Sequence, residues 1–411
     1  MNLFSSLKQA ARKTEASLKD LALAVDKAYP IPGRHKNKLK FDVAEISSLF
    51  THSRQERGVS YLGKPNLLSA YLRYFLPWNV YRLCRLLPAL PLHLKDGDAV
   101  VDLGSGPLSL VLALWISRPE LRKLNLEFRC IDRTSHVLEA GKKIFEALVN
   151  VENNVPTSGD GQKWKIKTIK GEIQENGQLS VPIHGKPAAL VGAVNVYNEI
   201  FWNFSPMDKT ALRNLSVQSG HLLKTLCAAD GNILIVEPGI PRSGEFTSML
   251  RAALIDQSMP PLSPCTHERE CPFPGHDSHP KERKIGGKAK WCHFSFNVDG
   301  VPDDLVKLSA AAGIPKDRSF LSFLLAGKKE SGGSTDGVPA NGIVPVRIIS
   351  ESFPVGDRMG CYGCTAAGAA LCLLPEKENA DRFHSGSEAM IKLGSRRDSK
   401  SGALIGDLTD I

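Results

Sequence analysis

The 411-residue sequence predicts an α/β fold with a parallel sheet, because apolar segments alternate with helical segments from about residue 98 onward. The clearest apolar segments are Ala99–Leu103, Leu126–Asp132 and Asn232–Glu237. A glycine-rich turn, Gly104-Ser-Gly106, follows the first of them and leads into a helical segment. Strands separated by helices imply parallel pairing through right-handed crossovers.

The first 95 residues are predicted to be helical and basic, with a break at Tyr29–Lys40. Residues 1–100 hold 16 Lys/Arg and 8 Asp/Glu, and the whole chain has a net charge of +9. This excess favours a polyanion such as RNA as partner, with a solvated basic face as the alternative. The aromatic residues of segment 67–87 have the spacing of a buried helix face. Three arginines among them, Arg73, Arg82 and Arg85, could instead line an RNA-facing surface.

The remaining elements of the sheet follow in chain order. Helices are predicted over Ser109–Ile116 and Ser135–Leu148, and strands over Lys165–Ile173, Ala188–Val196 and Ser319–Ala326. The predicted organisation is a helical region at 1–95, a sheet domain at 96–330 with an insertion at 258–294, a linker at 331–343, a small β element at 344–375 and a disordered tail at 376–411.

A nucleotide-type motif lies between the first strand and its helix. It reads Asp102-Leu-Gly-Ser-Gly106, where Gly104 and Gly106 let the backbone approach a ligand closely. Asp132, at the end of the second strand, suits the ribose hydroxyls of an adenosyl cofactor. The pattern resembles the Asp-x-Gly-x-Gly motif of class I S-adenosylmethionine methyltransferases; the alternative is the same fold without cofactor binding.

No catalytic residue can be assigned from the sequence. Many methyltransferases that act on nucleic-acid bases have a Pro-Pro pair after the fourth strand, but this chain has Asn195-Val-Tyr-Asn-Glu199 there. Cys227, just before the fifth strand, is expected to pack rather than react.

Four cysteines are the candidate metal ligands: Cys265, Cys271, Cys292 and Cys364, with Cys361 as a rival of the last. The first three lie among prolines and histidines, so soft thiolates and tight turns point to a metal or iron–sulfur site. Their spacing matches neither paired zinc knuckles nor the compact ferredoxin pattern. Zinc, including a Cys3His site, and an iron–sulfur cluster therefore both stay open, and buried free cysteines are the alternative.

Composition limits the cellular setting. Hydrophobic residues make up 42% and charged residues 23% of the chain, which are values of a globular protein. No apolar stretch reaches the roughly 18 residues of a membrane span, so no membrane partner is expected. No secretory signal is evident, and the nine cysteines are therefore expected to be reduced. Acidic residues in the N-terminal helix favour the cytoplasm over the mitochondrial matrix.

Taken together, these features resemble one family, the methyltransferase-like assembly factors of the small ribosomal subunit known from mitochondria and bacteria. The resemblance covers about residues 55–370. It depends on the order of several segments: Tyr61–Leu83, Asp102-Leu-Gly-Ser-Gly-Pro107, Asp132-Arg-Thr134, Ile235-Val-Glu-Pro-Gly239, Pro264-Cys-Thr-His267 with Cys271-Pro272, Trp291-Cys-His-Phe294 and Cys364-Thr-Ala-Ala-Gly368.

This resemblance implies a four-cysteine iron–sulfur cluster, of the 4Fe-4S type, on Cys265, Cys271, Cys292 and, rather than Cys361, Cys364. It also implies binding to the rRNA of the small ribosomal subunit during assembly, and an adenosylmethionine pocket. The protein is expected to be monomeric off the ribosome. The chain departs from the family pattern in a longer loop between Cys271 and Cys292 and in its polar tail.

Three functions compete at this point. The favoured one is an rRNA-binding assembly factor of the small subunit, in which the cluster has a structural role. The second is an active rRNA methyltransferase, which the absent Pro-Pro pair disfavours. The third, a radical enzyme that uses adenosylmethionine, is disfavoured because the compact Cys-x3-Cys-x2-Cys pattern of such enzymes is missing.

Overall fold

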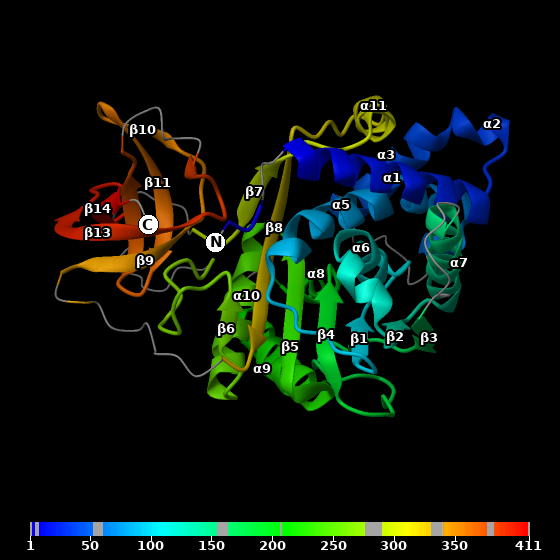
Figure 1. The fold of residues 1–411 in the computed structure, drawn as a ribbon, viewed down its shortest axis with the longest axis horizontal. Coiled ribbons are helices and arrows are strands. Elements are labelled where there is room, and N and C mark those ends of the chain that lie inside the picture. Colours follow the sequence, from blue (N-terminus) through cyan, green and yellow to red (C-terminus); the bar gives the residue numbers. More distant parts are fainter. Residues whose placement is uncertain are drawn as a thin grey trace.

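The computed structural model describes residues 2–4, 8–51, 61–153, 163–205, 208–275, 290–329, 339, 341–375 and 382–409. A large sheet with helices on both faces forms one side of the molecule, and a smaller β domain forms the other (Figure 1). The N-terminal end of the chain lies between these two parts (Figure 1).

The large sheet has eight strands in the order β3-β2-β1-β4-β5-β8-β6, with β7 also paired to β8. Its strands are β1 (Ala99–Leu103), β2 (Leu126–Asp132), β3 (Trp164–Lys170), β4 (Ala188–Val194), β5 (Cys227–Pro238), β6 (Pro261–Ser263), β7 (Phe294–Asn297) and β8 (Arg318–Gly327). Strands β1 to β5 pair in parallel, whereas β8 runs antiparallel to β5. A parallel sheet in this order, with an antiparallel strand beside β5, is the class I methyltransferase arrangement. The predicted fold class is therefore confirmed.

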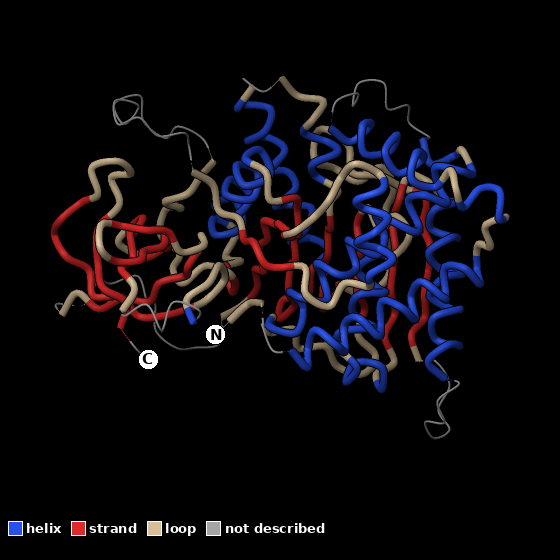
Figure 2. Tube along the Cα trace, turned by 90° about the horizontal axis from the view of Figure 1, so that it is seen from above, coloured by secondary structure: helices blue, strands red, loops and turns tan. Residues whose placement is uncertain are grey.

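Alternation along the strands creates two hydrophobic cores. On β1, the buried Val100 belongs to the core under α6 (Ser109–Ser117) and α7 (Ser135–Asn153). Its neighbours Val101 and Leu103 belong to the core under α8 (Tyr197–Phe201), α9 (Lys209–Leu226) and α10 (Pro241–Asp256). Successive side chains of a strand point to opposite faces, so a sheet covered on both sides needs apolar residues at every position. Figure 2 shows the strands as a layer with helices on either side.

The described part of the N-terminal region is mainly helical, as predicted. Its longer helices are α1 (Lys8–Ala28), α3 (Leu39–Thr51) and α5 (Leu76–Leu86); shorter ones are α2 (Gly33–Lys36), α4 (Pro65–Ala70), η2 (Tyr61–Gly63), η3 (Tyr71–Phe75) and η4 (Leu87–Ala89). Two further helices, η5 (Pro119–Lys123) and α11 (Asp303–Ala311), follow later in the chain. Tyr74, Trp78 and Tyr81 are fully buried, so the interpretation of these aromatic residues as core is confirmed.

The three arginines that were the alternative RNA-facing surface bind the protein itself through their guanidinium groups, and their contact with RNA stays a prediction. Arg73 pairs with Asp26 at 2.7 Å between Nη2 and Oδ1. Arg82 donates to the side-chain oxygen of Asn79, and burial lowers its pKa. Arg85 donates to the Tyr81 hydroxyl at 3.1 Å.

The C-terminal domain is a small β barrel. Its strands are β9 (Ile343–Ile348), β10 (Phe353–Val355), β11 (Arg358–Thr365), β12 (Gly368–Leu373), β13 (Glu388–Arg397) and β14 (Leu404–Thr409). They follow the order β10-β11-β12-β14-β13-β9, and an additional pairing of β9 with β11 closes the ring. Val346, Cys361, Cys372 and Ile391 belong to the core inside this ring.

The prediction of a disordered tail over residues 376–411 is wrong for its described part. Residues 388–397 and 404–409 form β13 and β14, which complete the barrel. A barrel strand needs apolar side chains on its inner face alone, and Ala389 and Ile391 supply them while Lys392 is exposed. This short alternation is easily taken for a polar tail. Residues 376–381 and 410–411 lie outside the described residues, as do residues 331–338 and 340 of the predicted linker.

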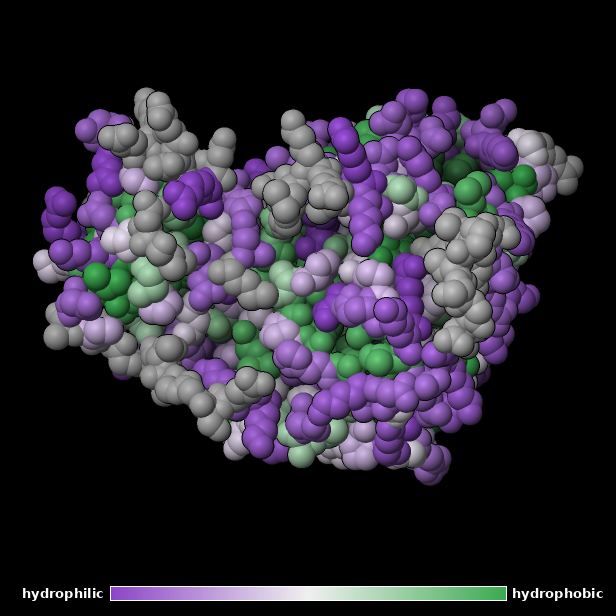
Figure 3. Space-filling model, in the orientation of Figure 1, coloured by the Kyte–Doolittle hydropathy of each residue, from purple (hydrophilic) through white to green (hydrophobic). Residues whose placement is uncertain are grey.

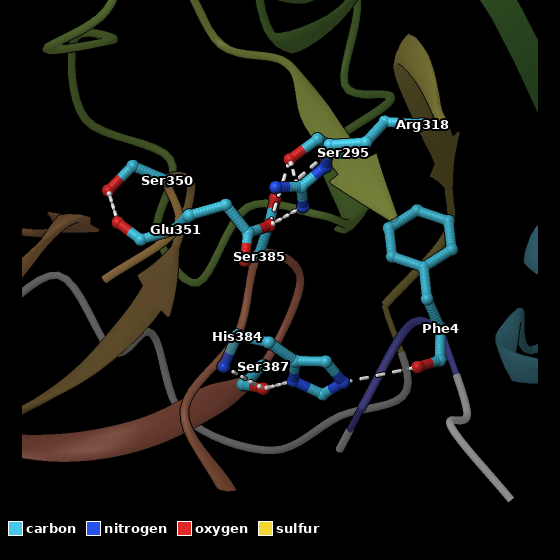
Figure 4. Close-up of polar contacts among 8 residues, drawn as sticks. All are labelled: Phe4, Ser295, Arg318, Ser350, Glu351, His384, Ser385 and Ser387. Carbon is cyan, nitrogen blue, oxygen red and sulfur yellow. Dashed lines mark hydrogen bonds and ion pairs between the residues drawn. The ribbon is translucent and has the colours of Figure 1, made fainter. Parts of the chain in front are cut away.

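Polar contacts fasten the barrel to the sheet and to the N-terminal segment (Figure 4). Ser295 of β7 donates from its hydroxyl to Glu351 Oε1 at 2.9 Å and from its amide to the Ser385 hydroxyl at 3.1 Å. His384 Nε2 lies 3.2 Å from the backbone oxygen of Phe4. Segments from three distant parts of the sequence therefore meet at this junction.

The outer surface is mixed in character. On the face drawn in Figure 3, hydrophilic residues cover most of the molecule and smaller hydrophobic patches lie between them. None of the described helices is long and apolar enough to cross a membrane.

Candidate functional site

The glycine-rich loop between β1 and α6 requires its glycines for two different reasons. Gly104 has φ = 64°, and a Cβ atom placed there would lie 2.3 Å from Cγ2 of Val196. Gly106 has φ = 51°, but a Cβ atom there would meet nothing within 4 Å. Gly104 thus serves both backbone conformation and close packing, whereas Gly106 serves conformation alone.

Asp132, the predicted ribose ligand, lies directly beside this loop. Its two carboxylate oxygens accept hydrogen bonds from the backbone amides of Gly106, at 2.9 Å, and Thr134, at 2.8 Å. Burial raises the pKa of Asp132, and the two amides oppose that rise because they favour the charged form. The carboxylate is therefore held in place at the end of β2, where an adenosyl ribose would bind in this fold.

Asp102, the other predicted acid, lies beneath the cleft rather than at its surface. It is 1% exposed, and neither carboxylate oxygen has a hydrogen-bond partner among the described residues. The nearby Ser105 hydroxyl donates to the backbone oxygen of Asp102 at 2.7 Å. Burial raises the pKa of Asp102 to about 7, and the charge of Asp132 adds to the rise.

A cleft with a volume of ≈ 360 Å³ opens above the carboxyl ends of β1, β2 and β4. Gly104, Gly106 and Asp132 line it, so three of the four predicted cofactor-binding residues meet at one place. Sequence reasoning missed an ion pair of the lining, Arg133–Glu199, with 3.3 Å between Nη2 and Oε2. The described lining contains no cysteine, histidine or lysine, and the catalytic role stays unassigned.

Glu237, at the end of β5, organises the far wall of the cleft. It is fully buried, and its carboxylate accepts the amides of Tyr197 at 2.9 Å and Asn198 at 3.1 Å. Burial raises the pKa of Glu237 to about 8, against the opposing effect of these amides. The side chain thus fixes the start of α8 beside Asn195, which has φ = 55°.

The four predicted cysteine ligands come from two separate parts of the fold, the connection between β6 and β7 and the barrel strand β11. Cys265 follows β6, Cys271 and Cys292 lie on the segment that leads to β7, and Cys364 lies on β11 of the barrel. Burial raises the pKa of Cys364 well above its usual value, and the three other thiols raise it further through charge repulsion. The four sulfur atoms therefore lie within electrostatic reach of one another.

Cys361, the rival ligand, lies on the opposite face of β11. It pairs in register with Cys372 of β12, and both are completely buried in the barrel core. Cys364 points instead toward the sheet domain, where His267 Nε2 lies 3.3 Å from its sulfur. Residues 276–289, which include His276 and His279, lie outside the described residues.

Two arginines that sequence reasoning missed surround the thiols. Arg251 of α10 donates from Nε to the sulfur of Cys265 at 3.2 Å and from Nη2 to the backbone oxygen of His267 at 2.7 Å. Arg347 of β9 donates to the backbone oxygen of Pro264 at 2.9 Å. Burial lowers the pKa of Arg347, and the thiols of Cys265 and Cys292 oppose this effect. Both cations would offset negative charge on the cysteines.

The four cysteine sulfurs are suitable ligands for a metal or cluster that binds thiolates, but they do not form a compact site for a single ion. Among the described residues, no group of three or more His, Cys, Asp or Glu side chains is arranged to hold a metal ion. A single tetrahedral zinc with bonds of about 2.3 Å would bring its sulfurs to about 3.8 Å from one another. A cuboidal cluster holds its thiolates farther apart, because several metal atoms lie between them.

One family model matches the chain. Residues 211–383 match "Mitochondrial small ribosomal subunit Rsm22". The matched segment contains all four cysteines and does not include the glycine-rich loop. No curated protein sequence gives a significant match.

Two solved structures similar to this chain are named as methyltransferases. The geranyl diphosphate C-methyltransferase of Streptomyces coelicolor A3(2) is 9% identical, with 73% of this chain and 100% of that chain covered and a TM-score of 0.31. An S-adenosylmethionine-dependent methyltransferase of Geobacter sulfurreducens is 13% identical, with 62% and 91% covered and a TM-score of 0.29. The assignment of the fold rests on the strand order described above.

Proposed function

We propose that this protein is an assembly factor that binds the small ribosomal subunit through its rRNA, on a methyltransferase-like scaffold. The observation that carries the proposal is the match of residues 211–383 to a family named for the mitochondrial small ribosomal subunit. In the structure, this segment runs from α9 through the four cysteines into the barrel, so it includes the part of the chain that departs from a plain methyltransferase.

Co-sedimentation tests the ribosomal partner. A tagged full-length protein in a lysate of its own cells should move with the small subunit or its precursors on a sucrose gradient. Removal of the protein should make precursors of the small subunit accumulate. Migration with the large subunit, or only as free protein, would contradict the proposal.

The cysteine site is proposed to hold an iron–sulfur cluster, with zinc as the alternative. The ligands are Cys265, Cys271, Cys292 and Cys364, and their convergence from separate segments around Arg251 supports the assignment. Once bound, the cluster would supply metal–thiolate bonds that cross-link the segment after β6 to β11. Because the four cysteines meet only when the chain is folded, loading and folding are expected to be coupled.

Iron content and the visible spectrum of anaerobically purified protein decide between cluster and zinc. A brown protein whose iron is lost in Cys292→Ala and Cys364→Ala supports the cluster. Cys361→Ala is the matched control, since Cys361 lies on the same strand but faces the barrel core. Colourless protein with one zinc, or equal loss in all three variants, would refute the ligand assignment.

The cleft is proposed to bind S-adenosylmethionine. Its volume of ≈ 360 Å³ falls in the usual range of small-molecule sites, and its lining includes Asp132, the acid predicted to bind the ribose. Calorimetry with S-adenosylhomocysteine should show binding that Asp132→Asn weakens at least about tenfold. Asp256→Asn, a change of an exposed acid at the end of α10, should leave affinity unchanged. Equal affinities in both variants would exclude this pocket.

A methyl-transfer assay distinguishes the alternative function, an active rRNA methyltransferase, from the proposed assembly factor. Labelled methyl groups from S-adenosylmethionine should not reach small-subunit rRNA if the protein acts only in assembly. Transfer that disappears in Asp132→Ala, with co-sedimentation intact, would replace the first proposal by the second.

The name of the matched family favours the mitochondrial matrix, rather than the cytoplasm, as the compartment. Fractionation of cells that express the tagged protein tests this proposal. A monomeric state off the ribosome stays a prediction, and light scattering on the purified protein tests it.

A further inference from the structure

The strand pairings of the C-terminal barrel define an oligonucleotide-binding (OB) fold. Its long strands, in chain order, are β9, β11, β12, β13 and β14. All their pairings are antiparallel except β12 with β14, and the ring closes through β9 with β13 and β11. The order first-second-third-fifth-fourth-first, with a parallel third and fifth strand, is the topology of the OB fold. Such barrels bind oligonucleotides or oligosaccharides across the second and third strands, between the loops that follow the first and the fourth strand.

An aromatic pair lies at this position on the barrel. Tyr362 of β11, the second strand, stands on the outer face, because its neighbours Cys361 and Gly363 face the core. Its ring centroid is 5.1 Å from that of Phe353, which lies in the connection after the first strand. Both rings are half-buried, and Leu371, across from Tyr362, is buried. Tyr362 also packs against the hydrophobic core that extends from the sheet domain, so its ring is held where the barrel meets that domain.

Hydrogen bonds fix the orientation of the strand that carries Tyr362. The amide of Tyr362 donates to the Ser350 hydroxyl at 2.8 Å, and its carbonyl accepts the amide of Ile349 at 2.9 Å. These contacts tie Tyr362 to the connection that holds Phe353. A stacking surface that is held in advance loses little conformational entropy on binding.

Positive charge lies next to the aromatic pair. Lys290 Nζ is 3.4 Å from the centroid of the Tyr362 ring, and Lys290 is also close enough to act on the charge of Asp398, the first residue of the loop after the fourth strand. On the same loop and the strand before it, Arg396, Arg397 and Lys400 are exposed. These cations lie on or near the loop after the fourth strand, which flanks the binding face of an OB fold, and they suit phosphates.

We propose that the barrel binds single-stranded RNA at this aromatic pair: a base takes the place of Lys290 Nζ over the Tyr362 ring, and the displaced ammonium and the loop after β13 hold phosphates. Flat rings accept any base face, and cations track the backbone, so single strands are favoured over duplexes. The inference deepens the proposed function, since it rests on RNA as the ligand, and it assigns that RNA to a defined surface. An oligosaccharide, the other ligand class of such barrels, has fewer reasons to bind beside this positive charge.

Fluorescence anisotropy with the full-length protein and a labelled 12-nucleotide single-stranded RNA tests the proposal. Tyr362→Ala and Phe353→Ala should each weaken binding about tenfold, the lower range for loss of one stacked base. Tyr362→Trp should restore affinity, and Phe41→Ala, a change of an exposed ring on α3, should leave it unchanged. A plot of the logarithm of the binding constant against the logarithm of the salt concentration should become less steep by about 0.7 in Lys400→Ala, the value for the loss of one phosphate contact.

Three outcomes would overturn the proposal: equal binding of duplex and single strand, tighter binding of an uncharged oligosaccharide, or unchanged RNA affinity in both alanine variants. Thermal melting of each variant shows that the barrel is folded. Binding of single-stranded RNA through these rings, without co-sedimentation with the small subunit, would refute the proposed function but not this inference.

Discussion

Replacement of Gly104 by alanine should destabilise the sheet domain more than the same replacement of Gly106, two residues away. At φ = 64° the left-handed conformation costs an alanine about 1–2 kcal/mol, and Gly106 at φ = 51° has the same cost. A Cβ atom on Gly104 would also meet Val196 at 2.3 Å, which is well inside contact distance. Relief of such overpacking costs about 1–3 kcal/mol. We therefore expect a loss of about 2–5 kcal/mol for Gly104→Ala and about 1–2 kcal/mol for Gly106→Ala.

Urea unfolding followed by tryptophan fluorescence measures both losses, and a double-mutant cycle tests their cause. Val196→Ala removes the Cγ2 atom nearest to the new methyl group, although Cβ of Val196 would stay 2.6 Å away. The double variant should therefore recover only part of the extra loss, with a coupling energy on the order of 1 kcal/mol. Equal losses for the two glycines, or additive effects of Gly104→Ala and Val196→Ala, would refute the reasoning.

Three further changes test other parts of the structure. Burial raises the pKa of Glu237 from 4.5 to about 8. Between these two pH values the folded protein keeps a proton that the unfolded chain has lost. The free energy of unfolding should therefore fall as the pH rises from 4.5 to 8. Glu237→Gln should flatten that fall in urea titrations at about pH 5 and pH 8. Arg347→Met removes a buried cation whose Nη2 lies 2.9 Å from Glu388, and it should lower the free energy of unfolding by about 3 kcal/mol in the same assay. Arg358→Met, at a more exposed ion pair, should lower it by less than about 1 kcal/mol. Arg251→Met should lower the iron content of purified protein or shorten the lifetime of its visible band in air several-fold, and unchanged values would show that this cation does not support the cysteine site.

The parallel strands could be predicted from the sequence because both faces of the sheet are buried. Ala99–Leu103 and Leu126–Asp132 have the predicted bounds in the structure, since eight of their twelve residues are apolar and the segments therefore stand out against their surroundings. The barrel strands carry the opposite pattern. In β13, Ala389 and Ile391 face the core while basic and polar residues follow, so local composition resembles that of a disordered tail. Only the pairing with β9 and β14 identifies the strand.

The site residues divide in the same way. Gly104 and Gly106 belong to one short motif after β1 and Asp132 ends the neighbouring β2, so their meeting at the cleft follows from the parallel topology. Arg251 and Arg347 carry no local signal, because each is a single basic residue in an ordinary helix or strand. Their roles depend on long-range contacts with the cysteine segment, which neither spacing nor composition encodes.

The two-residue period of β11 connects the cysteine site with the barrel surface. Cys361 and Gly363 face the barrel core, so Tyr362 and Cys364 must share the outer face, about 7 Å apart along the strand. A shift of register by one residue would bury both Tyr362 and Cys364 and turn Cys361 to the outer face instead. The same alternation therefore selects Cys364 as the candidate ligand and Tyr362 as the candidate stacking ring. Any bond that anchors Cys364 to the segment after β6 also limits how far Tyr362 can move, which joins the two proposed sites through a single strand.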